Sequence, residues 1–299
     1  MQKTRGLSLS ELLISLLVIG VVMAATMGLL YAFFGHFSQS DDYSAARQRA
    51  EMVLTILEKP VLMTGLGIPL KGGMFVQSFK NSTNNNLQNL GSAIKIMNAN
   101  GKQHNDLRLL YALPSGRAST SEWDLASGDT PTISLTSGDP LSAAFVDNNK
   151  GETRGWVIFP HYGYPLGVET RANDSVKVIA NISGKIAFFD ELHFLRNFRI
   201  VESADSIYTY DGYFVLDSQT TPLLHRRVDG IVGLYADYQA ASGILTVWVM
   251  ARGERKANSP YYTQNRILEW VGGTIDIPDF NTNRYYRLAV AQAKWRVRN

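Results

Sequence analysis

The sequence predicts an α+β fold, in which a long N-terminal helix packs on a globular domain built around an antiparallel β-sheet. Three features indicate this fold. Residues 12–37 form an apolar run without a formal charge, an apolar stripe at helical spacing follows this run, and residues 286–297 alternate between apolar and polar side chains. A helix and a sheet that each have one apolar face can bury both faces by packing together.

The N-terminal apolar run is long enough to cross a membrane. Its 26 residues would extend about 39 Å as a helix, whereas the hydrocarbon core of a bilayer is roughly 30 Å thick. Lys3 and Arg5 precede the run, so the positive-inside rule predicts a cytoplasmic leader and a globular domain outside the cytoplasm. Glu11 lies at the start of the run, where burial of a carboxylate in lipid is costly. This acid needs a partner.

The N-terminus resembles a known signal. Residues 6–11 read G-L-S-L-S-E and resemble the type III signal of type IV prepilins and pseudopilins, which has a short basic leader, a glycine and a glutamate five residues later. In that family a membrane prepilin peptidase cuts after the glycine and N-methylates the new terminus, and the glutamate pairs with an N-terminal amine during filament assembly. The resemblance implies cleavage between Gly6 and Leu7, N-methylation of Leu7 and an assembly role for Glu11.

Two other interpretations of the N-terminus are an ordinary signal anchor and a cleaved secretory signal peptide. The small residues around Ala24 would suit signal-peptide cleavage. Sequence after a cleaved signal peptide should be unrelated to it, but here the helical pattern continues well beyond Ala24. The prepilin interpretation is therefore preferred.

The second half of the expected helix is amphipathic and ends at Pro60, because proline disrupts a helix interior. Its apolar stripe follows spacings of three and four: Tyr43, Ala46, Ala50, Val53, Leu54 and Leu57. The charged residues of the other faces are Arg47, Arg49, Glu51 and Glu58. The expected organisation is a leader at 1–6, a transmembrane half-helix at 7–37, an amphipathic half-helix at 38–59 and a β-rich globular domain at 60–299.

Short strands are expected through the globular domain, separated by loops rich in glycine, asparagine and serine. The expected strands cover residues 107–113, 133–135, 156–159 and 176–180, with at most a short strand at 74–79 in an otherwise loop-like segment. Residues 191–197 suit either a helical turn or a strand. Two hairpins are expected from 213–216 with 223–228, and from 232–238 with 244–251, before the final strand at 286–297.

The globular part also resembles PilW-type minor pilins in the order of its landmarks. These are residues 105–111, 212–216, 222–226, 228–231 with Leu234 and Tyr238, and 295–299. The resemblance implies a minor pilin of the bacterial inner membrane that primes or caps a type IV pilus. Its implied partners are other minor pilins, the major pilin, the membrane assembly platform and a tip adhesin. The alternatives are a J-type pseudopilin of a type II secretion system and, from another class, an exported enzyme domain on an uncleaved anchor.

Composition gives little sign of catalysis. The chain of 299 residues has no cysteine, which excludes disulfides and thiolate metal sites. Loss of the leader would leave 27 basic and 26 acidic side chains, so no strongly charged partner is implied. No nucleophile, zinc or nucleotide motif occurs, and the five histidines do not fall at a metal-ligand spacing. We expect neither enzymatic activity nor a cofactor.

Two oxygen-rich stretches were compared with calcium loops, of the kind that some exported pilin-like domains contain. Residues 147–152 begin like an EF-hand loop, but the glycine comes one place early and no acid closes the loop. The other candidate set precedes the last strand and consists of Asp276, Asp279, Asn281 and Asn283. A solvated loop broken by Pro278 is the preferred interpretation of this set.

Basic residues gather near the C-terminus: Arg284, Arg287, Lys294, Arg296 and Arg298. A basic stripe is the minimal footprint of a DNA-binding surface, and DNA binding is known among pilus-associated proteins. Alternation with an apolar face explains the last three residues as the solvated side of a sheet. We therefore do not expect DNA binding.

Overall fold

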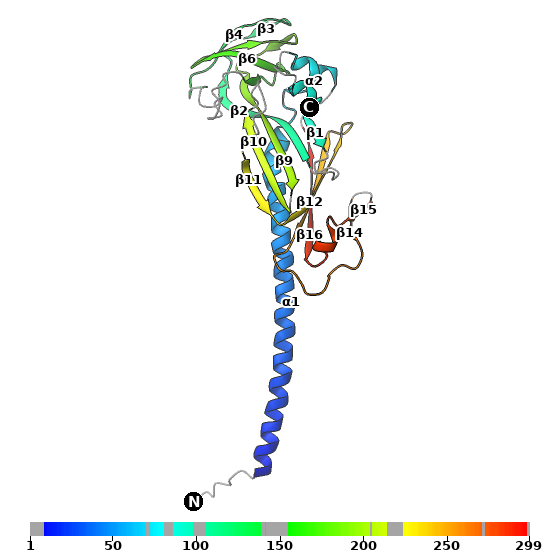
Figure 1. Ribbon diagram of the computed structural model, residues 1–299. Helices are drawn as coiled ribbons and strands as arrows, with labels where there is room; N and C mark the ends of the chain where they lie inside the picture. The colour runs from blue at the N-terminus through cyan, green and yellow to red at the C-terminus, as the bar shows by residue number, and fades with distance from the viewer. Residues whose placement is uncertain are drawn as a thin grey trace, which may run out of the picture.

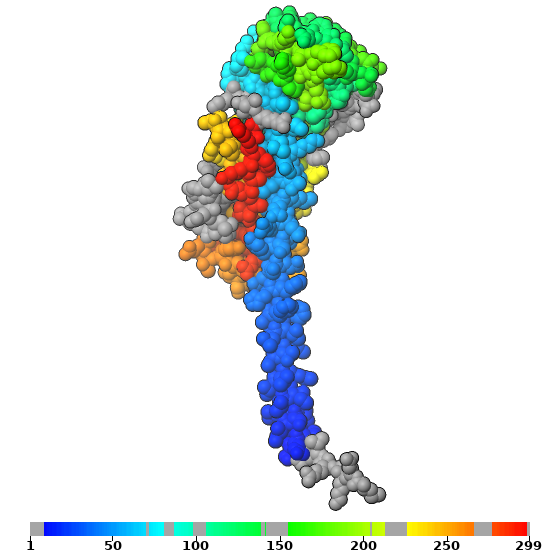
Figure 2. All heavy atoms as spheres, turned by 180° about the vertical axis from the view of Figure 1, so that it is seen from behind, coloured from blue at the N-terminus to red at the C-terminus, as the bar shows by residue number. Residues whose placement is uncertain are grey.

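The computed structural model describes residues 9–69, 72–80, 86–97, 106–138, 141, 155–203, 205–213, 224–270 and 273–297. It shows one long helix with a β-rich domain around its C-terminal half (Figure 1). The N-terminal half of the helix extends alone below the domain, as seen from the opposite side in Figure 2. This is the predicted α+β, pilin-like architecture.

Helix α1 runs over Leu9–Met63 without interruption. The predicted stripe is confirmed from Ala46 onwards, because Ala46, Ala50, Val53 and Leu57 are fully buried, and Leu54 is also buried. Tyr43 is the exception, with 46% of its surface exposed. Arg47, Glu51 and Glu58 lie on the exposed faces, and Arg49 is half-buried.

The prediction that the helix ends at Pro60 was wrong. The helix continues by one turn beyond this residue. Pro60 and Val61 are both buried, and the hydroxyl of Thr64 donates to the Pro60 carbonyl over 2.8 Å. Proline removes one backbone donor, but here the burial of the last turn and its side-chain cap outweigh that loss.

The buried face of α1 packs on a three-stranded antiparallel sheet. Its strands are β12 (Ile231–Gln239), β13 (Ile244–Arg252) and β16 (Leu288–Arg296), in the order β12-β13-β16. The predicted alternation of β16 is confirmed, because Ala289 is buried and Ala291, Ala293 and Trp295 pack against the core, whereas Gln292, Lys294 and Arg296 are exposed. The predicted cover of the sheet by α1 is also confirmed, since α1 contacts both β13 and β16.

A larger sheet of nine described strands continues the domain upward. It follows the order β1-β2-β9-β5-β6-β7-β4, with β10 pairing β9 and β11. The strands are β1 (Ile94–Met97), β2 (Asp106–Ala118), β4 (Thr132–Ser134), β5 (Trp156–Ile158), β6 (Pro165–Ala172), β7 (Ser175–Ile179), β9 (Glu191–Ser203), β10 (Ser206–Tyr213) and β11 (Leu224–Asp229). The long strand β9 contributes side chains both to the α1 core and to a second, apical core.

The apical core lies beyond the end of α1, at the top of Figure 1. A small two-stranded sheet of β3 (Trp123–Leu125) and β8 (Gly184–Ile186) packs there. At the other end of the domain, β14 (Arg266–Trp270), β15 (Gly273–Asp276) and the short helix α5 (Phe280–Asn283) lie beside the three-stranded sheet. Side chains of this region, including Ile277 and Leu288, form a third small core.

Several local predictions need correction. Residues 73–78 form helix α2 (Gly73–Ser78), not a strand, because Phe75 and Phe79 point to one side at helical spacing and are fully buried. Another short helix, α3 (Asn86–Leu90), and strand β1 occupy the segment predicted to be loop. Residues 191–197, which suited either structure, belong to strand β9. Strands β3, β6, β8, β14 and β15 were not predicted, and β10 (Ser206–Tyr213) meets the strand expected at 213–216 only at Tyr213.

Candidate assembly site

The predicted processing residues Gly6 and Leu7 lie outside the described residues. Glu11 is described and lies exposed in the first turn of α1. A carboxylate in this position interacts favourably with the positive end of the helix dipole. The hydroxyl of Ser15 donates to the Glu11 carbonyl over 2.8 Å, so the local backbone is satisfied within the helix.

The half of α1 that follows Glu11 has an unusual surface for a protein in water. Large apolar side chains from Leu12 to Phe37 are all exposed, from 44% for Leu30 to 77% for Tyr31. The Thr26 hydroxyl donates to the Val22 carbonyl over 2.8 Å, so this polar group is satisfied within the helix in an apolar environment. Among the described residues, α1 is the one helix long and apolar enough to cross a membrane. An exposed apolar surface of this length requires lipid or other helices as its surroundings.

The environment of α1 changes sharply at Ser38. Arg255 donates to the Ser38 hydroxyl, and Arg287 donates to Gln39 over 2.6 Å. One turn later, Asp42 is buried against Gly253, where an added Cβ would lie 3.0 Å from the Asp42 carbonyl oxygen. The domain therefore begins to hold the helix within a few residues of the end of the apolar run.

Further contacts fix the helix to the sheet. Arg49 donates to the Arg252 carbonyl over 2.9 Å and forms an ion pair with Glu254 at 2.6 Å. The fully buried Leu57 belongs to the same core as the inner faces of β13 and β16. Because one uninterrupted helix carries both the exposed apolar half and the buried half, the domain and the apolar half are mechanically joined.

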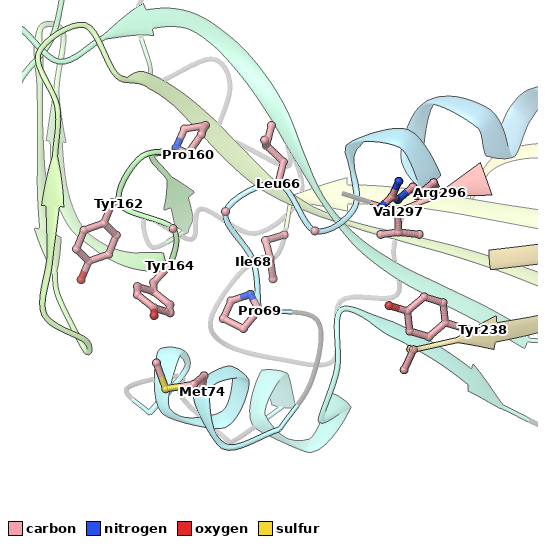
Figure 3. A pocket seen from close by; sticks show the side chains of 14 residues that line it. Leu66, Ile68, Pro69, Met74, Pro160, Tyr162, Tyr164, Tyr238, Arg296 and Val297 are labelled. Atoms are coloured by element: carbon pink, nitrogen blue, oxygen red, sulfur yellow. The ribbon is translucent and has the colours of Figure 1, made fainter. Parts of the chain in front are cut away.

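A hollow of about 950 Å³ lies where the end of α1 meets the apical region (Figure 3). Its described lining includes Leu66, Ile68, Pro69, Met74, Tyr162, Tyr164, Tyr238 and Arg296. The chain enters this region through Gly67, whose φ of +65° is left-handed and where an added Cβ would clash with the side chain of Ile158, so a larger residue would not fit. Burial raises the pKa of Tyr238. The described lining of the hollow thus contains aromatic rings, hydroxyl groups and the guanidinium group of Arg296.

The apical region also presents an exposed aromatic pair. Phe188 and Phe189 are 52% and 62% exposed, with ring centroids 4.2 Å apart. Phe189 has φ of 60°, a left-handed conformation that is strained for a bulky residue. Asp190 holds the turn, because its carboxylate accepts from the backbone amide of His161 over 3.1 Å, and burial raises the pKa of this carboxyl.

One of the four candidate cation ligands, Asn283, makes other contacts. Asn283 is 1% exposed; its side chain accepts from Arg252 over 3.1 Å and donates to the Pro278 carbonyl over 2.6 Å. Asp279 and Asn281 are exposed. The side chain of Asp276 and the whole of residues 147–152 lie outside the described part. Within the part of the chain that the structure describes, no three histidine, aspartate or glutamate side chains are grouped to hold a metal ion.

The late basic residues fall into two separate places. Arg284 and Arg287 lie at the lower end of the domain, where Arg284 stacks over Tyr285 and Arg287 over Tyr261. Lys294 and Arg296 lie toward the other end of β16, about 25 Å along the strand. Arg298 is outside the described residues. The sequence predicted the exposed face of β16, but not the contact of Arg287 with Tyr261, which joins two separate segments of the chain.

Comparison with known proteins gives one match. The model of the prokaryotic N-terminal methylation motif matches residues 1–27. No curated protein and no solved structure matches the chain. The chain thus carries a type IV pilin-like prepilin signal on a membrane-anchoring apolar helix, as in pilin-like and pseudopilin proteins, which indicates contact with a prepilin peptidase and with pilus assembly machinery in general.

Proposed function

We propose that this protein is a minor pilin similar to the PilW type, which primes or caps a type IV pilus. The observation that carries the proposal is the continuity of α1. Its exposed apolar half starts at the methylation signal, and its second half is built into the β-rich domain. One helix can then serve first as a membrane anchor and afterwards as a packing element among the helices of other pilins.

In this proposal the residues of the signal have separate roles. Cleavage between Gly6 and Leu7 by a prepilin peptidase creates a new N-terminal amine, which is methylated on Leu7. Glu11 stays in the apolar half of α1, where a lipid environment makes a charged group costly by several kcal/mol. Pairing with the N-terminal amine of a neighbouring subunit lowers this cost and forms a charge-assisted hydrogen bond. The pairing fixes the axial register of one helix against the next.

The domain is proposed to face the outside of the cytoplasm and to contact other minor pilins, the major pilin and the membrane assembly platform. The apical region continues beyond the end of α1, so it fits best at a position where no further subunit is stacked above it. The apical region, with Phe188 and Phe189 exposed, is therefore proposed to lie at the pilus tip and to contact a tip adhesin. We propose an assembly role without enzymatic activity, cofactor or DNA binding.

Two substitutions separate processing from assembly. Glu11→Ala lies beyond the scissile bond, so this variant should be cleaved normally. It should enter pili roughly tenfold less than the unmodified protein, because losing a hydrogen bond to a charged group costs about 1.5 kcal/mol or more. Gly6→Val should block cleavage, because a bulky residue replaces the small one next to the scissile bond. Ser15→Ala is the matched control, since it removes one exposed polar group from the same helix and keeps the charge.

The measurement is the amount of mature protein in membranes and in sheared pili, by immunoblot. Normal incorporation of Glu11→Ala would contradict the proposed pairing. Recovery of the protein with the subunits of a secretion pseudopilus instead of a pilus would replace the minor-pilin assignment with the J-type pseudopilin.

A further inference from the structure

A group of cationic and aromatic side chains lies beside α1 where its apolar half ends. We call Arg255, Lys256, Tyr261, Arg284 and Arg287 the basal collar. The segment 255–262 crosses the lower edge of the domain beside α1, as the orange region of Figure 2 shows. Backbone hydrogen bonds tie it to the segment before β16, with the Tyr261 amide donating to the Arg284 carbonyl over 2.8 Å. The collar is therefore a built part of the domain.

The collar is fixed at a defined height on the helix. Arg255 contacts Ser38 and Arg287 contacts Gln39, the two residues that follow the uncharged run ending at Phe37. The run extends about 39 Å from Leu12 as a helix, which is about 9 Å more than the hydrocarbon core. A headgroup layer adds roughly 5–8 Å on each side. When α1 crosses the bilayer upright with Leu12 at the inner edge of the hydrocarbon core, Ser38 lies at the outer edge of the headgroup layer, and the collar lies there with it.

The chemistry of the collar suits a surface of phosphate groups. Segments 255–265 and 280–287 contain four cations and no acidic residue. No carboxylate among the described residues pairs with any of these four cations, whereas the neighbouring Glu254 is paired with Arg49 at 2.6 Å. The carboxylates of α1 at this level are Asp41, which is exposed, and Asp42, which is buried.

Aromatic rings contact three of the four cations. Arg287 lies 4.1 Å above the ring of Tyr261, Arg284 lies 5.0 Å from Tyr285, and Lys256 lies 5.3 Å from the same ring. Arg284 also donates to the Tyr285 hydroxyl over 3.0 Å. Tyrosine is enriched at membrane interfaces because its ring is apolar and its hydroxyl is polar. The collar thus combines the two residue types that bind the interface.

We propose that the basal collar docks the domain on anionic phospholipid headgroups while the subunit is anchored in the membrane. The inference rests on the membrane anchoring in the proposed function and adds a lipid-binding surface to it. Docking sets the domain upright on the membrane, with the apical region directed away from it. Leaving the membrane for a filament then requires release of the collar from the lipid surface.

The test uses the full chain in lipid nanodiscs and exploits the absence of cysteine. A fluorescent dye is attached to Ser259→Cys in the exposed part of the collar segment, to Ser121→Cys in the apical region, or to Val21→Cys in the apolar half. Quenching at positions 259 and 121 by lipids with a headgroup-proximal nitroxide, and at position 21 by lipids with a nitroxide on the acyl chain, is compared in phosphatidylcholine and in phosphatidylcholine with 30% phosphatidylglycerol. Quenching at position 259 should be strong only with phosphatidylglycerol and should fall in 0.5 M salt, because salt screens surface charges.

Charge variants test the source of the attraction. Each cation near an anionic membrane contributes roughly fivefold, so Arg255→Gln with Lys256→Gln should shift the docking equilibrium about 25-fold toward the undocked state. Lys294→Gln with Arg296→Gln removes the same charge elsewhere and should leave quenching unchanged.

The dye at position 21 separates the two proposals. If the dye at position 21 is quenched but the dye at position 259 is quenched no more than the dye at position 121, docking is overturned and the anchor stands. No quenching at 21 would overturn the anchoring and, with it, the docking. If quenching at position 259 is the same with and without phosphatidylglycerol, anionic headgroups do not hold the collar. The same conclusion follows if both pairs of charge substitutions reduce quenching at position 259 equally.

Discussion

The contact between α1 and the sheet makes a quantitative prediction for Leu57. This side chain is fully buried in the core that α1 shares with β13 and β16. Leu57→Ala removes three carbon atoms, which costs about 2.4 kcal/mol of transfer free energy at roughly 0.8 kcal/mol per carbon. The cavity left between a helix and a sheet adds to this cost, so the free energy of unfolding should fall by about 3–4 kcal/mol.

This loss is large compared with a total stability of about 5–15 kcal/mol. It should lower the melting temperature by roughly 6–16 °C, at about 2–4 °C per kcal/mol for a domain of this size. The assay is thermal unfolding of the detergent-solubilised full chain, followed by tryptophan fluorescence and far-UV circular dichroism. Met52→Ala is the control, because Met52 lies on the same helix and is 53% exposed; its unfolding free energy should change by less than about 0.5 kcal/mol.

Equal melting temperatures for Leu57→Ala and Met52→Ala would refute the reasoning. Such a result would mean that the α1 stripe does not stabilise the isolated subunit. The stripe would then be a surface for another subunit, and the sheet would need a different cover.

Two further predictions concern the domain alone. Burial raises the pKa of Tyr162 to about 12, from 10.0, so the neutral phenol stabilises the fold below about pH 10 and this stabilisation is lost as the pH rises through about 12. Tyr162→Phe should therefore flatten this part of a curve of unfolding free energy against pH, and an unchanged slope would contradict the prediction. Deletion of residues 1–37 should leave a folded, soluble domain, whereas deletion of residues 1–59 should expose the sheet and cause aggregation, as size-exclusion chromatography can show; identical elution of both would argue against cover by α1.

The sequence predicted those parts of the fold that have one simple period. The stripe from Ala46 to Leu57 has the period of a helix buried on one side, and β16 alternates because only one of its faces meets the core. Strand β9 could not be assigned because Leu192, Leu195 and Phe198 match a helical spacing by chance.

Other elements depend on partners far away in the chain. Residues on both faces of β9 are buried, so no alternation marks it. Helix α2 has only Phe75 and Phe79 as a signal, within a glycine-rich segment, and the second of these packs on Trp156, with ring centroids 4.9 Å apart. Local sequence cannot indicate that contact.

The same distinction applies to the candidate site. The processing signal is local, so residues 6–11 suffice to predict it. The collar requires Arg255 to meet Ser38, a pair separated by 217 positions, and only the folded chain brings them together. The extension of α1 past Pro60 also depends on tertiary burial.

The mass of the mature N-terminus tests the central claim most directly. The chain is co-expressed with a prepilin peptidase, purified from membranes and analysed by mass spectrometry of its N-terminal peptide. The account predicts a chain that begins at N-methylated Leu7 and retains Glu11 as its fifth residue. An intact Met1, or an N-terminus at Ala25, would contradict the account, because α1 would then be an ordinary anchor or would have lost its apolar half.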